Sequence, residues 1–288
     1  MEIIDAQIHD PHTVAPIDDR YGDDVRLLVE CEMAREALDC VGVDVALVNA
    51  HQAFLDFAVS RYPDRFAGCA RWSLDTPDVE EFVATYRDRP GMLAVRTGIS
   101  HWATGQVSDE FKAGRLEPLL VAAEKHQVPV FMGAMGVAAH LAPVAEAHPG
   151  LVMIVDHLGL ASPPPMSRVP DPWSTLPGVL SLAKYPNVAI KFSGAVALSK
   201  SPYPHPDLWP YLHQIVEAFG PERLMWGSDY TRLRMAPGTT ERGPRSGWGG
   251  LYSDSVNYLR DTDELSESDK ATIFSGTIRR LLRWPAAA

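Results

Sequence analysis

The sequence lacks the cysteine patterns that mark a disulfide framework or a thiolate metal site. It contains three cysteines, an odd number, which are widely spaced and include no C-x-x-C pair: Cys31, Cys40 and Cys69. An excess of basic charge is also missing, because the formal net charge is -11 and the isoelectric point is near 5.3. We therefore expect no basic surface that binds a phosphate backbone, and no nucleic-acid partner.

Long apolar runs are missing as well, and none of those present is long enough to span a bilayer. Near the N-terminus, Glu2 and Asp5 carry negative charge where a signal peptide needs positive charge. These absences favour a cytoplasmic protein in a reducing compartment, with no membrane partner. A homo-oligomer stays open, since the composition does not bear on self-association.

What the sequence does contain is an alternation of two patterns. At 288 residues, with 46% hydrophobic and 22% charged residues, the chain can bury a full core. Short β-like runs alternate with segments of helical period, which is typical of repeated βα units on a parallel sheet. Eight such runs predict an α/β fold, a (β/α)8 TIM barrel, more than a doubly wound sheet. We expect a single domain over residues 1–288.

The expected elements follow from these patterns and from their flanking turn and cap residues. The expected strands are Glu2 to Ile8, Val43 to Asn49, Phe66 to Trp72, Met92 to Thr97, Val128 to Met132, Leu151 to His157, Val188 to Ser193 and Arg223 to Asp229. The expected helices are Asp24 to Cys40, Gln52 to Tyr62, Asp78 to Asp88, Arg115 to His126, Val137 to His148, Thr175 to Tyr185, Asp207 to Phe219 and Ser266 to Arg283.

Two long polar stretches interrupt this regularity. Ser162 to Pro172 follows the sixth strand, and Thr231 to Gly250 follows the eighth. Loops of this length in a compact domain are usually functional or mobile. Both belong to the C-terminal face of the predicted barrel, where enzymes of this fold keep their active sites.

Polar side chains end three of the predicted strands. Gln7 and His9 share one face at the end of the first strand, because side chains alternate between faces. His157 ends the sixth strand and Asp229 ends the eighth. Two imidazoles and a carboxylate therefore converge in this prediction. They are suited to a catalytic metal ion or to a metal-free acid and base pair.

With the residues placed in this way, the chain resembles the amidohydrolase-related (amidohydrolase 2) branch of the amidohydrolase superfamily. Among its members it resembles most the lactone hydrolases, such as 2-pyrone-4,6-dicarboxylate and sugar lactonases. Four segments carry the resemblance: Ile4 to His9, Val155 to Gly159, Asn187 to Gly194 and Arg223 to Tyr230. The resemblance implies a distorted TIM barrel whose reaction centre is surrounded by the first-strand histidines, a sixth-strand histidine and an eighth-strand aspartate.

The sequence departs from the family pattern at the ligand positions. The first of the two histidines usual on the first strand is Gln7, whose amide oxygen is a poor ligand for zinc. The fifth strand has no histidine, and the fourth offers Arg96, so a binuclear centre is not expected. The remaining ligands for one divalent ion, with zinc favoured, are His9, His157 and Asp229. Gln7 is expected to be a weak ligand or not to bind the ion at all. The same three groups are also able to work without a metal.

A second group of residues indicates an anionic substrate. Four cations lie near strand ends in an otherwise acidic protein: Arg71, Arg96, Lys191 and Arg232. A structural ion pair is the simpler interpretation of any single one, but together they predict an anion site. Arg96 is the strongest candidate, because a guanidinium holds a carboxylate with two parallel bonds.

Two further side chains complete the sequence-based site. Tyr230 and His51 follow strand ends and are candidates for shaping the pocket. Lys191 points inward by alternation and needs a partner, for which Asp229 is the natural candidate. Asp156, of opposite parity to His157, is expected to face the helix layer.

The sequence therefore predicts a hydrolase that opens a carboxylated lactone or related cyclic ester. Asp229 is the expected general base, with His9 and His157 at the reaction centre. Two alternatives stay open. One is a metal-dependent nonoxidative decarboxylase of the same family, against which the incomplete ligand set argues. The other is a noncatalytic anion-binding barrel, which the presence of Gln7 favours and that of Asp229 opposes.

Overall fold

The computed structural model describes residues 1–11, 22–101, 104–162, 169–233 and 251–285, with side chains in the fourth range given as far as residue 231. Eight strands form one sheet, in the order β1-β2-β3-β4-β7-β8-β9-β10, and every neighbouring pair in that order is parallel. The strands are β1 (Ile4–Ile8), β2 (Val45–Val48), β3 (Phe66–Arg71), β4 (Met92–Gly98), β7 (Val130–Gly133), β8 (Met153–Val155), β9 (Val188–Ser193) and β10 (Leu224–Gly227).

The first and last strands bring the sheet round into a barrel. The backbone N–H of Asp229, just past β10, donates to the carbonyl oxygen of Gln7 in β1 at 2.9 Å. Gly227 permits this approach, because a Cβ atom there would lie 3.2 Å from the backbone nitrogen of Gln7. The predicted TIM barrel is confirmed.

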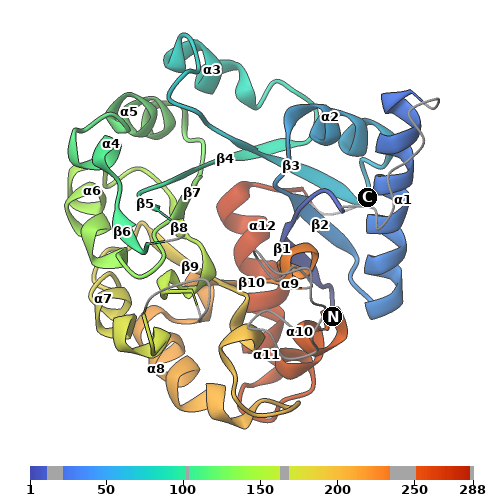
Figure 1. The fold of residues 1–288 in the computed structure, drawn as a ribbon, viewed down its shortest axis with the longest axis vertical. Helices are drawn as coiled ribbons and strands as arrows, with labels where there is room; N and C mark the ends of the chain where they lie inside the picture. The colour runs from blue at the N-terminus through green and yellow to red at the C-terminus, as the bar shows by residue number, and fades with distance from the viewer. Residues whose placement is uncertain (12–21, 102–103, 163–168, 234–250, 286–288) are drawn as a thin grey trace.

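Helices surround the barrel in the alternating order that the sequence predicts (Figure 1). They are α1 (Asp23–Val41), α2 (Gln52–Arg61), α3 (Val79–Tyr86), α4 (Asp109–Lys112), α5 (Glu117–His126), α6 (Ala142–Ala147), α7 (Leu176–Leu180), α8 (Trp209–Phe219), α9 (Tyr230–Leu233), α10 (Tyr252–Arg260), α11 (Glu267–Ala271) and α12 (Thr277–Leu282). In the described part of the chain, no helix has both the length and the apolar character needed to cross a membrane.

Several elements differ from the sequence-based prediction. The last expected helix, 266–283, is interrupted by a π-helical turn, Thr272–Gly276, so it becomes α11 and α12. The expected helix 137–148 begins as a 3-10 turn, Ala138–Leu141, before α6, where Pro143 enters the first helical turn. A two-stranded hairpin, β5 (Ser100–His101) with β6 (Gln106–Val107), and α10 were not predicted.

Two apolar clusters hold the barrel together. The inner one consists of alternate strand residues such as Ile4, Ala6 and Ile154, and Ile278 and Leu282 of α12 belong to it. Because α12 joins this inner cluster, it packs against the interior of the barrel and not only against the outer face of the sheet. The outer cluster lies between the strands and the surrounding helices and is much larger. Complete burial of both faces accounts for the nearly continuous apolar runs in the strands.

Candidate active site

The end of β1 supplies two side chains to the interior. Ile4 and Ala6 already face inward, so strict alternation would turn Gln7 toward the helices. The pairing of β1 with β2 shifts register between Asp5 and Ile8, and this irregularity turns Gln7 to the inner side. The Gln7 amide nitrogen lies 3.2 Å from His9 Nε2, and both side chains are buried.

His157 reaches the same place through a sharp turn. Its φ angle of 51° and that of Leu158, 58°, lie in the left-handed region and end β8 abruptly. Ser193 fixes the result, since its hydroxyl oxygen accepts from the His157 backbone N–H at 3.3 Å and lies 3.0 Å from ring Nδ1. Burial lowers the pKa of His157 to about 4, so the imidazole is neutral near neutral pH.

Asp229 is the carboxylate that these groups surround. It also has a left-handed φ, 56°, and its side chain is 3% exposed. Its Oδ1 atom lies 3.1 Å from His9 Nε2 and accepts from the Gln7 amide nitrogen at 3.0 Å, whereas Oδ2 lies 4.0 Å from His157 Nδ1. Burial alone would raise the pKa of Asp229, but the hydrogen bond with His9 helps hold it below its usual value. Asp229 is therefore ionised at neutral pH.

Asp156 faces the barrel interior, which corrects the expectation that it lies against the helices. Ile154 points inward, and Asp156, two residues further along, points inward by the same alternation. The turn at His157 then directs the His157 side chain inward as well. Asp156 is fully buried, with Oδ1 at 2.6 Å from Lys191 Nζ and Oδ2 at 2.5 Å from Arg96 Nε. Burial would raise its pKa, but these two cations outweigh burial and hold the pKa well below its usual value.

Lys191 thus pairs with Asp156, where the sequence suggested Asp229. Its side chain is 1% exposed, and its ammonium group lies 4.7 Å from the centre of the Phe131 ring. The same ammonium donates to the Gln7 amide oxygen. Burial lowers the pKa of Lys191, and the charge of Asp156 opposes that effect.

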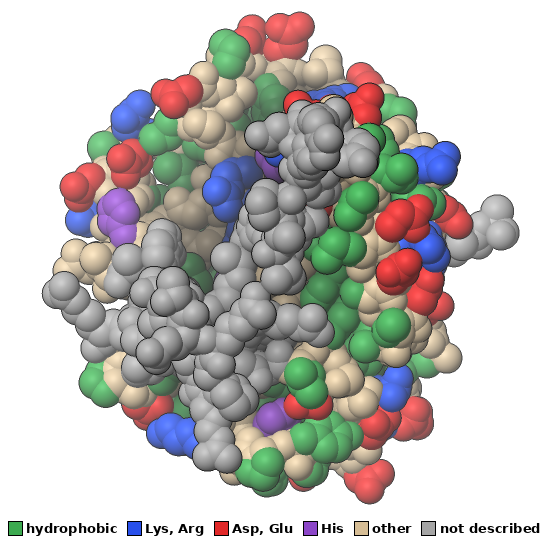
Figure 2. Space-filling view, turned by 45° about the vertical axis from the view of Figure 1, so that its right-hand side comes forward, with side chains coloured by type: hydrophobic (Ala, Val, Ile, Leu, Met, Phe, Trp, Pro, Cys, Tyr) green, Lys and Arg blue, Asp and Glu red, His purple; other side chains and the backbone are tan. Residues whose placement is uncertain are grey.

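Arg96 lies at the open end of the network formed by Arg96, Asp156, Lys191, Gln7 and Asp229. Its side chain is 13% exposed, in contrast to the enclosed Lys191. With its amide oxygen turned toward the guanidinium, Asn49 accepts from Nε and Nη1 of Arg96 at 3.1 and 3.0 Å. Arg71 is the register partner of Arg96 on the neighbouring strand, and it is exposed. In Figure 2, basic side chains line a recess of the surface.

The other predicted pocket residues occupy different settings. Tyr230 is buried and stacks on Tyr252, with ring centroids 4.2 Å apart. His51 is exposed and caps α2, since its Nδ1 accepts from the Phe54 N–H at 3.3 Å. The side chain of Arg232 lies outside the described residues.

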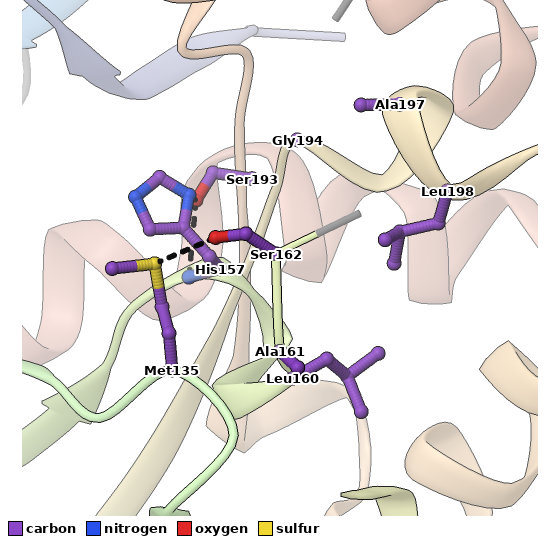
Figure 3. Close-up of a pocket in the computed structure, with 9 residues that line it drawn as sticks. All are labelled: Met135, His157, Leu160, Ala161, Ser162, Ser193, Gly194, Ala197 and Leu198. Carbon is purple, nitrogen blue, oxygen red and sulfur yellow. Dashed lines mark hydrogen bonds between the residues drawn. The ribbon is translucent and has the colours of Figure 1, made fainter. Parts of the chain in front are cut away.

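A small pocket adjoins His157 (Figure 3). Mostly apolar side chains line it, and Ser162 and Ser193 add hydroxyl groups: Met135, His157, Leu160, Ala161, Ser162, Ser193, Gly194, Ala197 and Leu198. Sequence reasoning missed Ser193, although it has the inward parity of Lys191. It also missed Met135, for which the sequence carries no signal, and Ser162, whose only signal is its place at the start of the long polar stretch after the sixth strand.

The predicted ligands do not form a site that fits a metal ion. Among the described residues, no three His, Cys, Asp or Glu side chains are arranged to hold one. His9 and Asp229 instead converge on the amide nitrogen of Gln7, which carries hydrogens and has no lone pair for a cation. The amide oxygen, which is the atom able to bind a metal, is already engaged by Lys191.

Comparison with known sequences identifies the family. Residues 4–284 match the amidohydrolase family. A segment of 95 residues is 38% identical to the L-fucono-1,5-lactonase of Burkholderia ambifaria. That segment covers 32% of this chain and 30% of the lactonase, so the similarity spans about a third of either protein.

Solved structures agree over the whole chain. An amidohydrolase from Burkholderia multivorans with bound zinc has a TM-score of 0.72 at 17% identity, over 99% of this chain and 100% of that one. A probable 2-pyrone-4,6-dicarboxylic acid hydrolase from Acinetobacter baumannii, with citric acid bound, has a TM-score of 0.67 at 19% identity, over 99% and 100%. These similarities show a shared fold. Because the family match extends over nearly all of the sequence, the chain belongs to the amidohydrolase family, as its strand-end residues predict.

Proposed function

We propose that the protein hydrolyses a lactone, or a related cyclic ester, that bears a carboxylate. One observation carries this proposal: the ionised Asp229 carboxylate lies within 4.0 Å of both imidazoles, at the C-terminal end of a barrel. A buried carboxylate with one oxygen bound by donors and the other less engaged is suited to accept a proton from water. Simple anion binding gives no reason for a negative charge at this point.

In the proposed reaction, water enters against Asp229 Oδ2. The oxygen Oδ1 already accepts from Gln7, so Oδ2 is the atom that takes the proton. The resulting hydroxide attacks the ring carbonyl carbon. The developing oxyanion then accepts a hydrogen bond from an imidazole N–H group of His9 or His157. When the tetrahedral intermediate collapses, the ring C–O bond breaks and the leaving alkoxide takes back the proton from Asp229. The product is an open-chain hydroxy acid.

The substrate carboxylate binds to Arg96, with Arg71 beside it. Arg96 is the cation of the buried network with exposed surface, and its planar fork fits a carboxylate. Lys191 is enclosed and already engaged by Asp156 and Gln7, so we assign it to the support of Gln7 in place of direct substrate binding. Asp156 carries one negative charge, whereas Arg96 and Lys191 together carry two positive charges. The excess positive charge attracts an anion.

The pocket next to His157 has room for little more than one water molecule, so it is too small for the ring of a substrate. Its mostly apolar wall and two serine hydroxyls are suited at most to one small substituent. The names of the similar lactonase and of the similar pyrone hydrolase support this class of substrate. The position of Gln7 between the candidate ligands argues against the decarboxylase, which needs a complete set of metal ligands. Gln7 also fits a noncatalytic barrel, but the buried, ionised Asp229 argues against that alternative.

The experiment that tests the proposal is a substrate panel in which each carboxylated lactone is paired with its methyl ester or decarboxylated counterpart. We expect ring opening, followed by proton release, with a clear preference for the carboxylated member of each pair. Activity is expected to persist in a chelator, since no step uses a metal. A panel with no turnover on any lactone, or with equal turnover on both members of every pair, would contradict the proposal.

A further inference from the structure

The amide nitrogen of Gln7 lies where three side-chain atoms of the site converge. It is 3.0 Å from Asp229 Oδ1, 3.2 Å from His9 Nε2 and 3.5 Å from His157 Nε2. These three residues are the ones that would have to bind a divalent ion. The point at the centre of the candidate ligands is therefore filled by an atom of the protein itself.

The orientation of the carboxamide is fixed by chemistry. Lys191 has donor hydrogens only, so the end of the amide that it contacts must be the oxygen. The NH2 end then has to face Asp229 and the imidazoles. Lys191 cannot easily withdraw, because the Asp156 carboxylate and the Phe131 ring enclose its ammonium group.

The charge next to this point also opposes a cation. Lys191 is 1% exposed and contacts the other end of the same carboxamide. Repulsion between a divalent ion and a buried ammonium group one amide length away is only weakly screened. A neutral amide donor has no such conflict. It also leaves Asp229 a better base than a metal-bound carboxylate would be.

We propose that the Gln7 carboxamide takes the place of a divalent cation between His9, His157 and Asp229, with Lys191 as its anchor. Gln7 is a positioning residue that directs Oδ1 of Asp229 away from the substrate and leaves Oδ2 as the base. The inference rests on the proposed function in treating this place as the reaction centre. Its test does not depend on turnover, so the two proposals can fail separately.

The test observes the Gln7 side-chain amide directly. The chain contains five glutamines, so selective ¹⁵N labelling gives five pairs of NH2 signals, and loss of one pair in Gln7→Met assigns Gln7. The exposed Gln52 amide, which donates to Asp56 at 2.8 Å, is an internal control. We expect the Gln7 hydrogens to exchange with solvent at least tenfold more slowly than those of Gln52, and Lys191→Met to abolish that difference. Equal exchange rates in the wild type would overturn the anchored arrangement.

Zinc chloride then tests the replacement of the cation. In the wild type, added zinc is expected to leave the Gln7 signals unmoved, even if ions bind elsewhere on the surface. Any zinc-dependent shift of these signals that His9→Ala removes would overturn the proposal. Gln7→His, alone or with Lys191→Met, is expected to bind about one equivalent of zinc in equilibrium dialysis. If both variants keep their circular dichroism spectra and neither binds zinc, the amide is not what excludes the ion, and the proposal fails.

Discussion

Asp156 and Lys191 form an ion pair in the interior of the barrel, 2.6 Å between Oδ1 and Nζ, with 0% and 1% of their side chains exposed. The other carboxylate oxygen of Asp156 holds Arg96. One carboxylate thus connects the exposed end of the site to the residue that anchors Gln7. Burying these charges costs free energy, which only the complete set of partners offsets.

The first prediction concerns Asp156→Asn. The amide keeps the volume but removes the charge, which leaves Lys191 buried without a compensating charge and Arg96 without its ion-pair partner. We expect the free energy of unfolding to fall by about 3–5 kcal/mol, the usual effect of breaking a buried pair. Urea denaturation followed by circular dichroism measures it. Asp109→Asn, which removes the exposed pair with Lys112, is the control and should leave the urea midpoint unchanged. A wild-type midpoint for Asp156→Asn would contradict the buried network.

The position of these residues shows how far the sequence was informative. Polar residues at the ends of apolar runs predicted that His9, His157 and Asp229 meet, and the structure places them within hydrogen-bonding distance or close to it. The runs themselves predicted the eight strands, because parallel strands buried on both faces have a continuous apolar pattern. These signals depend on residue type and order alone.

The inward turn of individual side chains could not be predicted in the same way. Asp156 and His157 are neighbours, and alternation allows only one of them to point inward. Both do so because His157 adopts a left-handed backbone conformation, which is uncommon for residues other than glycine and leaves no mark in the sequence. Gln7 faces inward only because the pairing of β1 with β2 shifts register, and that shift depends on contacts between two strands.

A second prediction addresses the proposed base. Asp229→Asn is expected to lower kcat by about 10²–10⁴-fold on whichever lactone the panel identifies, because the amide cannot accept a proton from water. Asparagine tolerates the left-handed conformation found here, so the fold should persist. Steady-state kinetics with matched circular dichroism spectra measures both. Asp75→Asn, at an exposed aspartate away from the site, should keep wild-type kcat. Full turnover by Asp229→Asn would exclude its role as base.

A third prediction concerns the pH dependence of stability. Asp5 is fully buried, and burial raises its pKa to about 6, despite hydrogen bonds from Ser228 and Tyr252. Because the unfolded chain has the lower value, near 3.8, the folded protein binds the extra proton between these two pH values. The contribution of Asp5 is therefore fully favourable below about pH 4 and is lost as pH rises to about 6, by about 3 kcal/mol.

The variant Asp5→Asn isolates this effect, because an amide does not titrate in this range. We expect the difference in unfolding free energy between variant and wild type to change by about 2 kcal/mol in favour of the variant from pH 4 to pH 6.5. Urea titrations at several pH values measure the difference, in which the contributions of other carboxylates cancel. A difference that stays constant over this interval would show that Asp5 has an ordinary pKa.

The last prediction tests the contact between the first and last strands. A methyl group at residue 227 would lie 3.2 Å from the backbone nitrogen of Gln7 and 3.4 Å from the carbonyl carbon of Ala6. These are backbone atoms and cannot turn aside, so Gly227→Ala must separate β1 from β10. We expect a loss of about 1–3 kcal/mol in unfolding free energy, as is usual for overpacking.

The same displacement separates Gln7 from Asp229, which the backbone hydrogen bond of 2.9 Å now holds in register. Turnover should therefore fall in Gly227→Ala by more than the loss of folded protein explains. Gly22→Ala is the matched control, because a methyl group there meets nothing within 4 Å. Urea midpoints and kcat measured on the folded fraction of both variants decide the matter. If Gly227→Ala has the same urea midpoint and the same kcat as Gly22→Ala, the barrel does not depend on close contact between β1 and β10.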